Sequence, residues 1–336
     1  MELFNDMHEK VCNLSGIKEI CITSTLKTGD REISFQYRKD NTYAKGIKEE
    51  AYIRTNEDEF VIKQIEPSGD WYKCTGMMNV EEMEGRQLPT GFETVEKTAE
   101  DCCNEAIAGT GWTVTFCGVK KKRTVRIEQN CSAWDVVQQV ISTYRCEIKF
   151  DSIHKGIAIY EQIGEDRGAY FMERLNLKRL QIQSNSYNFC TRLICIGKDG
   201  LMLNIGGKNY LENYQYSRKV KTCTWKDERY TDEESLREDG EAKLDELSKP
   251  YKSYTADIVN LVEAVQDGEE RERYREVFDI ALGDTVLLMS KSTGIRERHR
   301  IVKMYQYPQT RSKNKVELAN TRLSFEEVQK TEQELS

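Results

Sequence analysis

Side chains that usually build metal or catalytic centres are scarce in this sequence. Its 336 residues include only three histidines, His8, His154 and His299. None of the 11 cysteines belongs to a C-x-x-C pair, although Cys102 and Cys103 are adjacent. Structural zinc sites need thiolates and imidazoles clustered at short spacings. The sequence therefore predicts no metal site, and the scattered cysteines are expected to be buried free thiols in a reducing compartment.

A basic excess, a signal peptide and a membrane-spanning run are also missing. The chain has 50 basic and 57 acidic residues, a formal net charge of -7, whereas domains that wrap nucleic acid usually carry a basic excess. Residues 1–6 are acidic and lack the basic start and apolar run of a signal peptide. The apolar run 280–282 is broken by Gly283 and Asp284, and a membrane span needs about 20 apolar residues. We expect synthesis in the cytoplasm and no membrane span.

No local pattern carries catalytic chemistry. Nucleophilic catalysis needs a nucleophile beside a base, and none of the histidines has a G-x-S-x-G or cysteine-protease signature nearby. The adjacent carboxylates Glu81-Glu82 and Glu269-Glu270 are expected on solvated faces, because adjacency does not set the spacing that glycoside cleavage needs. The segments 197–200 and 206–208 lack phosphate-loop spacing and predict hairpin turns. We predict no catalytic, cofactor-binding or metal-binding residues.

Residues 1–84 alternate apolar and polar positions over short segments. Ile33, Phe35 and Tyr37 fall on one face of such a segment. Similar segments occur at 20–27, 51–54, 59–65 and 71–76, with turn residues between them. This pattern favours a first small β domain, either a barrel or a sandwich.

Residues 85–168 show a different pattern, that of an α/β domain. Thr98 and Ser132 are candidate caps of two helices, one reaching Ile107 and one covering 133–144. The second helix places Val136, Val137, Val140 and Ile141 on one face. Expected strands lie at 112–116, 124–127, 146–151 and 156–160.

Residues 169–325 return to strand patterns and predict a second β-rich block. Expected strands lie at 177–183, 190–196, 201–205, 253–262, 284–289, 298–307 and 315–318. A helical insertion is expected at 226–249, with Thr231 and Glu234 as a capping pair. Residues 326–336 form a charged tail. The expected fold class is α+β, mainly β, with an α/β domain between two β-rich blocks.

Two features could face a partner. The basic run Lys120–Arg123 lies between two expected strands, so it is either a solvated hairpin tip or a contact for DNA or lipid. Tyr210, Tyr214 and Tyr216 could form an aromatic platform for a receptor or could line a subunit interface. The segment 271–275 alternates Arg and Glu and is expected to be an exposed charged loop or turn.

Short motifs follow one another in order along almost the whole chain. They are Ile22–Leu26 with Ile33–Phe35, Phe60–Ile65, Gly109–Trp112, Gly164–Gly168 with Asn176–Lys178, Thr191–Leu193 with Gly197–Leu201, Tyr210–Asn213, Trp225–Tyr230, Leu282–Asp284 and Arg300–Val302. In this order the motifs resemble the tail-associated, or prophage endopeptidase tail, proteins of siphophages. The individual motifs consist mainly of turn residues, so their joint order carries the resemblance.

The resemblance implies a baseplate-hub fold at the tip of a phage tail or phage-tail-like particle, with two small β-barrel domains, an α/β domain between them and a helical insertion in the second barrel. Three copies would form a ring of pseudo-sixfold symmetry that adapts a sixfold tail tube to the tip or spike. The implied partners are two further copies of the chain, a distal tail or tube protein, a tape-measure protein and a tip or spike protein, with DNA only in transit. Synthesis would take place in the cytoplasm of the bacterial host.

No catalytic residues are implied. Family members that cleave cell walls do so with extra C-terminal domains, and the chain ends at Ser336 without one. We therefore expect a structural protein and no enzyme. The alternatives are a peptidoglycan-degrading or glycosidic hydrolase and a carbohydrate- or receptor-binding tip module. We also expect the lumen of the ring to be acidic or neutral, because Lys and Arg contacts would retain DNA. Lys120–Arg123 should then point outward or at a neighbouring subunit.

Overall fold

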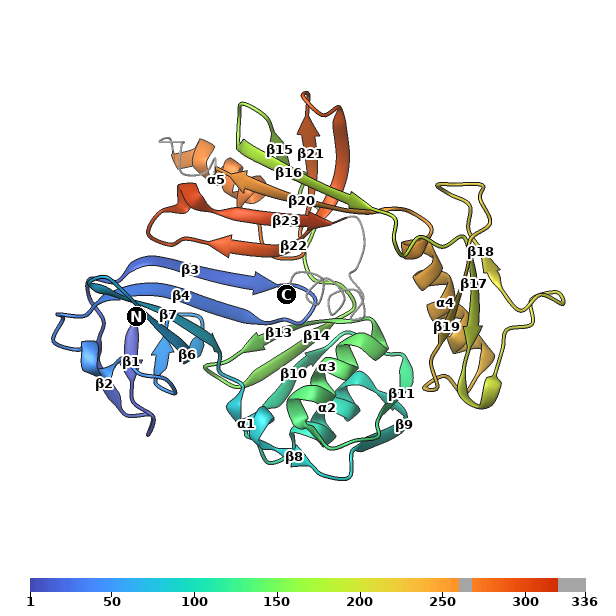
Figure 1. Cartoon of the computed structure of the whole chain (residues 1–336), viewed down its shortest axis with the longest axis horizontal. Helices are drawn as coiled ribbons and strands as arrows, with labels where there is room; N and C mark the ends of the chain where they lie inside the picture. The colour runs from blue at the N-terminus through green and yellow to red at the C-terminus, as the bar shows by residue number, and fades with distance from the viewer. Residues whose placement is uncertain (260–267, 320–336) are drawn as a thin grey trace.

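The structure is a computed structural model that describes residues 1–259 and 268–319 (Figure 1). The fold is α+β and mainly β, as predicted. The described residues form four units with separate buried apolar cores: an N-terminal β module, an α/β unit, an insertion unit and a C-terminal β module. The expected tail, 326–336, and the expected end of the last domain, 320–325, lie outside the described residues.

The N-terminal β module is an antiparallel sheet. Its elements are β1 (Glu2–Phe4), β2 (Lys10–Asn13), β3 (Lys18–Thr25), β4 (Arg31–Arg38), η1 (Ala44–Gly46), β5 (Tyr52–Arg54), β6 (Glu59–Ser68) and β7 (Trp71–Met78). The strand order is β3-β4-β7-β6-β5-β1-β2. Ile33, Phe35 and Tyr37 of β4 are all buried, which confirms the face that the alternation predicts.

The C-terminal β module continues the same sheet. Its elements are β15 (Tyr170–Met172), β16 (Leu177–Asn185), β20 (Tyr251–Ile258), α5 (Gly268–Phe278), β21 (Thr285–Ser290), β22 (Ile295–Gln306), η4 (Arg311–Lys313) and β23 (Lys315–Ala319). The strands follow the order β16-β20-β23-β22, and β21 pairs with both β15 and β22. The core between them includes the buried side chains of Phe171, Tyr254 and Leu288.

The two β modules are joined by pairing between β3 and β22. Thr25 lies opposite Lys303 and Ile22 opposite Gln306 in this antiparallel pair. The result is one 13-stranded sheet. The expected pair of β-barrels is not confirmed: among the described residues no path of paired strands closes on itself. Each module uses an outer strand to pair with the other, and so both of these edges are covered.

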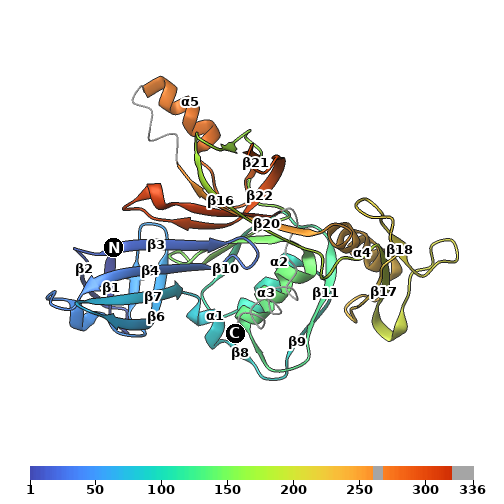
Figure 2. The same ribbon diagram turned by 45° about the horizontal axis from the view of Figure 1, so that its top comes forward.

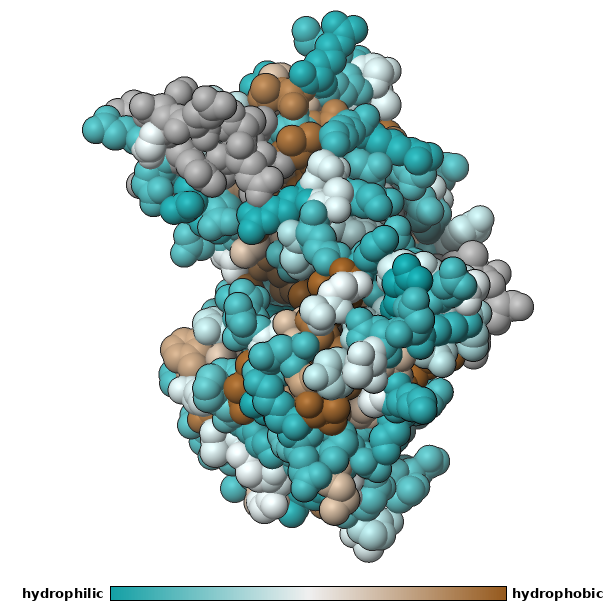
Figure 3. Space-filling view, turned by 90° about the vertical axis from the view of Figure 1, so that its left-hand side faces the viewer, coloured by the Kyte–Doolittle hydropathy of each residue, from teal (hydrophilic) through white to brown (hydrophobic). Residues whose placement is uncertain are grey.

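The side of the molecule that carries the N-terminal β module is mostly hydrophilic (Figure 3). A recess separates the upper and lower halves on this side, and hydrophobic residues are visible inside it (Figure 3). Seen in Figures 1 and 2, the insertion unit lies at the end opposite the N-terminal β module. The molecule is therefore elongated, with the paired sheets and the α/β unit between its two ends.

The α/β unit lies below the sheet in the view of Figure 1. Its elements are α1 (Glu81–Gly85), β8 (Gln87–Leu88), β9 (Phe92–Thr98), α2 (Ala99–Ile107), β10 (Thr113–Cys117), β11 (Lys122–Ile127), β12 (Cys131–Ser132), α3 (Ala133–Tyr144), β13 (Glu147–Asp151) and β14 (Gly156–Tyr160). Both expected caps are confirmed. Thr98 accepts the Asp101 N–H at 3.2 Å, and Ser132 accepts the Asp135 N–H at 3.1 Å.

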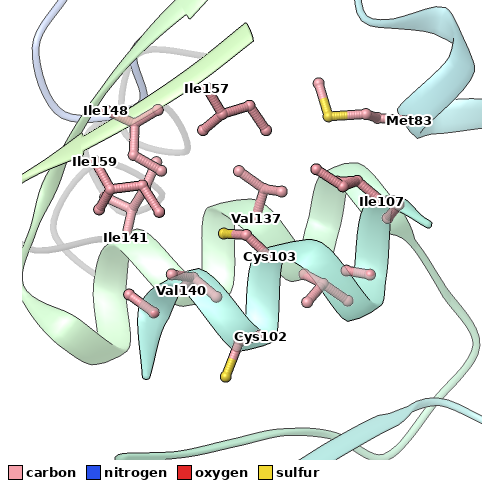
Figure 4. Close-up of a cluster of buried hydrophobic side chains, with 14 of the residues drawn as sticks. Met83, Cys102, Cys103, Ile107, Val137, Val140, Ile141, Ile148, Ile157 and Ile159 are labelled. Atoms are coloured by element: carbon pink, nitrogen blue, oxygen red, sulfur yellow. The ribbon is translucent and has the colours of Figure 1, made fainter. Parts of the chain in front are cut away.

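The core of the α/β unit lies between its helices and the sheet β10-β14-β13 (Figure 4). Val137 and Val140 of α3 point toward the same space as Ile157 of β14 (Figure 4). The face of α3 that the sequence predicts is buried throughout. Cys103 points into this core, whereas Cys102 points to the opposite side of α2 (Figure 4).

The insertion unit interrupts the C-terminal β module between β16 and β20. Its elements are β17 (Arg192–Ile196), η2 (Lys198–Gly200), β18 (Leu211–Glu212), β19 (Thr222–Lys226) and α4 (Glu233–Leu247). The expected helix is present, but its expected cap is wrong: Asp232 caps α4 by accepting the Ser235 N–H at 2.7 Å. Either of the adjacent residues Thr231 and Asp232 can cap a helix, and the later one does so.

The insertion is also larger than the helix expected at 226–249. The strand expected at 190–196 pairs with β18 and β19 and, through Ile196, with Met202. It therefore belongs to a small sheet that packs on α4, and not to the large sheet. A strand pattern in the sequence does not specify which sheet the strand joins.

The segment 271–275 lies inside α5, so the expected loop is wrong. Arg275 contacts Glu272 at 3.1 Å across one turn, and Tyr274 stacks on Phe278 at a centroid distance of 5.7 Å. Side-chain pairs three and four residues apart stabilise a helix even when its composition is highly charged.

Candidate functional site: the junctions between the units

A buried ion pair joins the α/β unit to the C-terminal β module. Arg300 of β22 donates from Nη1 to Glu147 Oε1 at 2.7 Å and from Nη2 to Glu147 Oε2 at 2.9 Å. The same guanidinium donates to the carbonyl oxygens of Ile163 at 2.7 Å and Gly283 at 3.1 Å. Glu147 is only 6% exposed, so its charge depends on this bidentate partner.

Two of the motifs that carry the resemblance pack against each other beside this ion pair. Gly164 and Gly283 have φ angles of 85° and 92°, and a Cβ on Gly164 would lie 2.2 Å from the carbonyl carbon of Gly283. The Asp284 carboxylate accepts the N–H of Glu165 at 2.9 Å and Nη2 of Arg167 at 2.7 Å. Only glycine permits so close an approach of the two loops.

These residues form one cluster, which we call the clasp: Glu147, Gly164, Gly283, Asp284 and Arg300. Three motifs from distant parts of the sequence, 164–168, 282–284 and 300–302, contribute to it. In each case the role of the motif is to hold two units together. The cluster has no nucleophile beside a base and is therefore not a catalytic arrangement.

A second polar junction fixes the insertion unit to the α/β unit. Arg123 donates from Nη2 to Glu238 at 2.7 Å and from Nε to Asp239 at 3.3 Å. The side chains of Arg123 and Asp239 are 9% and 3% exposed, and Lys121 lies 3.9 Å from Asp239. The basic run Lys120–Arg123 is therefore not a solvated tip as a whole: Arg123 serves a contact within the chain, while Lys120 and Lys122 stay exposed.

Further polar contacts complete this junction. Arg145 donates to Glu246 at 2.7 Å, and Arg229 of the insertion unit donates to Thr143 of α3. The apolar cores of the two units are separate clusters. The insertion unit is thus held on the α/β unit mainly by charges and hydrogen bonds. We call the contacts of Arg123, Arg145 and Arg229 the latch.

A third junction joins the N-terminal β module to the α/β unit through Glu59. The backbone N–H of Glu59 donates to Ser152 Oγ at 2.8 Å. Its carboxylate, 4% exposed, is bound by Arg54 at 2.5 Å and by the Asn79 amide at 2.8 Å. His8 also contacts this carboxylate, at 3.0 Å, so the first of the three histidines serves a structural contact.

The three histidines lie far apart in the fold. His154 is in the turn between β13 and β14, where Nδ1 lies 2.9 Å from Asp151 Oδ2. His299 is 3% exposed within β22 and packs on Tyr254 with a ring-centroid distance of 4.5 Å. The structure does not bring the histidines together at one site.

The other side chains singled out in the sequence also make separate structural contacts. Glu81 accepts from Tyr52 at 2.8 Å, and its neighbour Glu82 accepts from Trp112 Nε1 at 3.1 Å. Tyr210 stacks on Arg192, with the guanidinium 4.3 Å from the ring centroid. Residues 206–207 form a turn, and Lys198–Gly200 form the short 3-10 helix η2 between the antiparallel bridge partners Ile196 and Met202, so both segments reverse the chain as predicted.

The cysteines are free thiols, and most of them are buried. Burial raises the pKa of Cys103 well above its usual value and the pKa of Cys146 to about 12. Both thiols therefore stay protonated and unreactive at neutral pH. Among the described residues there is no group of three or more His, Cys, Asp or Glu side chains that could hold a metal ion. No helix in residues 1–259 and 268–319 is long and apolar enough to cross a membrane.

The residues that hold the junctions were not singled out in the sequence as partners. Arg300 and Glu147 lie in different predicted domains, and Arg123 and Asp239 are more than 100 positions apart. Isolated charged residues give no local signal of their partner. The glycine and aspartate motifs do give a signal. That signal indicates membership of a family and does not indicate which residues are in contact.

Three family models match successive parts of the chain. The prophage endopeptidase tail N-terminal domain matches residues 5–77, the prophage endopeptidase tail domain matches residues 91–160, and the prophage endopeptidase tail model matches residues 165–329. The chain belongs to the prophage endopeptidase tail family. Membership makes it a phage tail protein, as the motif order predicts. No curated protein matches the chain.

Solved structures of other tail proteins share the fold of this family member. Prophage tail protein gp18 from Listeria monocytogenes EGD-e has 15% sequence identity and a TM-score of 0.68, covering 98% of this chain and 96% of that chain. The 43 kDa tail protein of prophage MuSo2 from Shewanella oneidensis has 12% identity and a TM-score of 0.66, covering 95% and 97%. The tail protein from Neisseria meningitidis MC58 has 10% identity and a TM-score of 0.62, covering 95% and 94%. Identities this low show a common fold alone.

Breaking the ion pair of the clasp should destabilise the tail protein strongly. Arg300→Ala removes the guanidinium that pairs with the buried Glu147 carboxylate, and we expect a loss of about 3–5 kcal/mol in the free energy of unfolding. The double variant Arg300→Met with Glu147→Leu should recover most of that loss, because no charge is then left unpaired. Urea unfolding of the two variants and the wild type measures this, and equal losses in both variants would contradict the role of the pair.

The buried His299 should make stability depend on pH. Burial lowers its pKa below the usual 6.5, and Lys252 also opposes the charge, whereas Glu297 favours it. The unfolded chain therefore binds a proton more readily, so the stability contributed by neutral His299 is complete above about pH 6.5 and is lost as pH falls toward the folded-state pKa. Urea unfolding between pH 7.5 and 5.5 should show a smaller decline for His299→Leu than for the wild type. Equal declines would count against this prediction.

Proposed function

We propose that this tail protein is a structural hub subunit at the distal end of a phage or phage-derived tail. Three copies would form a ring that adapts the sixfold tail tube to the tip or spike. The observation that carries the proposal is the sheet through β3 and β22, which holds two β modules of one chain in a fixed relation. Two such modules per chain give a trimer six β surfaces to offer to a sixfold tube.

The polar junctions between the units support a structural role, in which the subunit bears mechanical load and takes part in assembly. The clasp, the latch and the Glu59 contacts hold the four units together through buried charged groups that have partners. In this proposal the domains are 1–84, 85–168 and 169–325. The partners are a distal tail or tube protein, a tape-measure protein and a tip or spike protein, with DNA passing through the lumen. The ring would be located at the tail tip.

The absence of enzyme activity is part of the same proposal. Three titratable groups singled out in the sequence, His8, His154 and Glu82, each have a hydrogen-bond partner. The motif residues serve turns and junctions. These observations support a structural role for the described residues and supply no catalytic arrangement for the hydrolase alternative.

Copy number tests the hub proposal directly. We expect three copies of the chain in each assembled tail tip, or a trimer in native mass spectrometry of the chain with its tail partners, because two β modules per chain match a sixfold tube only in a trimer. Image reconstruction of isolated tail tips, without imposed symmetry, gives the count. A ring with two copies or six copies would refute the proposal.

Hydrolase assays test the enzyme part. We expect the purified chain to leave peptidoglycan undigested, and His154→Ala and His299→Ala to give the same background signal, since neither side chain has a catalytic partner. Release of soluble fragments from purified cell walls is the measurement, and a tail-borne wall hydrolase is the positive control. Digestion by the wild type that either variant abolishes would show an endopeptidase instead.

A further inference from the structure

The C-terminal half of one strand of the large sheet is exposed. Among the described residues, 181–185 of β16 pair with β20 and with no other strand, and residues 181–188 are all exposed. Natural edge strands usually carry charges or proline, yet Gln181–Asn185 contain neither. This edge lacks the usual protection against pairing with another chain.

The surface around this edge is basic and contains exposed apolar residues. Residues 178–189 and 213–222 include five basic and no acidic residues, although the whole chain has a net charge of -7. The two segments adjoin each other, since Phe189 and Tyr216 form an edge-to-face pair at 5.9 Å. Tyr187 is 84% exposed, Tyr216 64% and Ile182 42%. We call residues 178–189 and 213–222 the arm surface.

A surface of opposite charge lies at another free edge of the molecule. Within residues 1–259 and 268–319, β9 has β11 as its single partner strand, and α2 follows β9 directly. Residues 93–105 contain five acidic residues and one lysine, and all five acidic residues are exposed. Val95 lies among them with 59% exposure. We call residues 93–105 the acidic surface.

We propose that the arm surface of one copy binds the acidic surface of a neighbouring copy, with the edge of β16 against β9. The inference rests on the proposed hub function and names the contact that would close its ring. A closed ring needs a contact between two different surfaces of the same chain. The two surfaces match in charge sign, and each presents exposed apolar residues at an open strand edge. Main-chain pairing would satisfy both edges.

Charge reversal tests the contact on the full chain. Arg218→Glu with Lys219→Glu, and separately Glu96→Lys with Glu105→Lys, should each weaken self-association at least about tenfold in sedimentation velocity. Combining the four substitutions restores opposite signs and should recover association. Lys73→Glu with Lys149→Glu is the matched control, since both lysines are exposed and lie outside the two surfaces. Ile182→Lys should also weaken association, and Ile182→Val should not.

The outcomes separate the contact from the hub function. Wild-type association that is lost in both reversed variants and recovered in their combination supports the contact. Association that is unchanged in the variants, or a wild type that stays monomeric at its highest soluble concentration, overturns it. The hub function is judged independently by the copy number in assembled tail tips. If assembled tail tips contained three copies whose arm surfaces and acidic surfaces did not touch, the hub function would be retained and the proposed contact would be refuted.

Discussion

The pairing of β3 with β22 is the contact on which the arrangement of the whole chain depends. It joins strands from opposite ends of the sequence. The entropic cost of closing so long a loop is only slightly greater than that of closing a shorter one, because this cost grows slowly with loop length. Once the pairing is formed, the two β modules share one sheet, and the α/β unit, which lies between them in the sequence, lies below that sheet in the view of Figure 1. The clasp can then bring Arg300 to Glu147, because β22 is already in place. The shared sheet thus determines where the units lie, and the polar junctions then fix their orientation.

Each unit has its own apolar core, while charged and hydrogen-bonded groups dominate several of the contacts between units. Burial of apolar surface is non-directional, and it would hold two units together in many similar orientations. A bidentate pair such as Arg300 with Glu147 requires one orientation. Buried ion pairs add little net stability compared with apolar contacts. Their use at these junctions therefore favours a defined geometry between the units over maximal stability.

Local features could be predicted from the sequence, whereas contacts between distant segments could not. The caps Thr98 and Ser132 and the buried face of α3 follow from spacing within one or two turns. The pairing of β3 with β22 has no local signal, and so two barrels were expected where one sheet exists. Arg123 appeared as part of a solvated run because its partner, Asp239, belongs to a different unit. The strand 190–196 was recognised, but its sheet was not, since alternation specifies a strand without specifying its neighbour.

Three of the motifs that indicate the family, 164–168, 282–284 and 300–302, contribute residues that hold units of the chain together. Gly164 and Gly283 allow two loops to touch, and Asp284 and Arg300 bind the backbone around them. Such residues are constrained by geometry, since a Cβ or a lost charge at these positions would disrupt a junction. Their role in this structure is to fix two loops and two units against each other. The surfaces carry a different contrast: the segments around β16 are basic and the segment of β9 and α2 is acidic, at two strand edges that have no partner strand among the described residues.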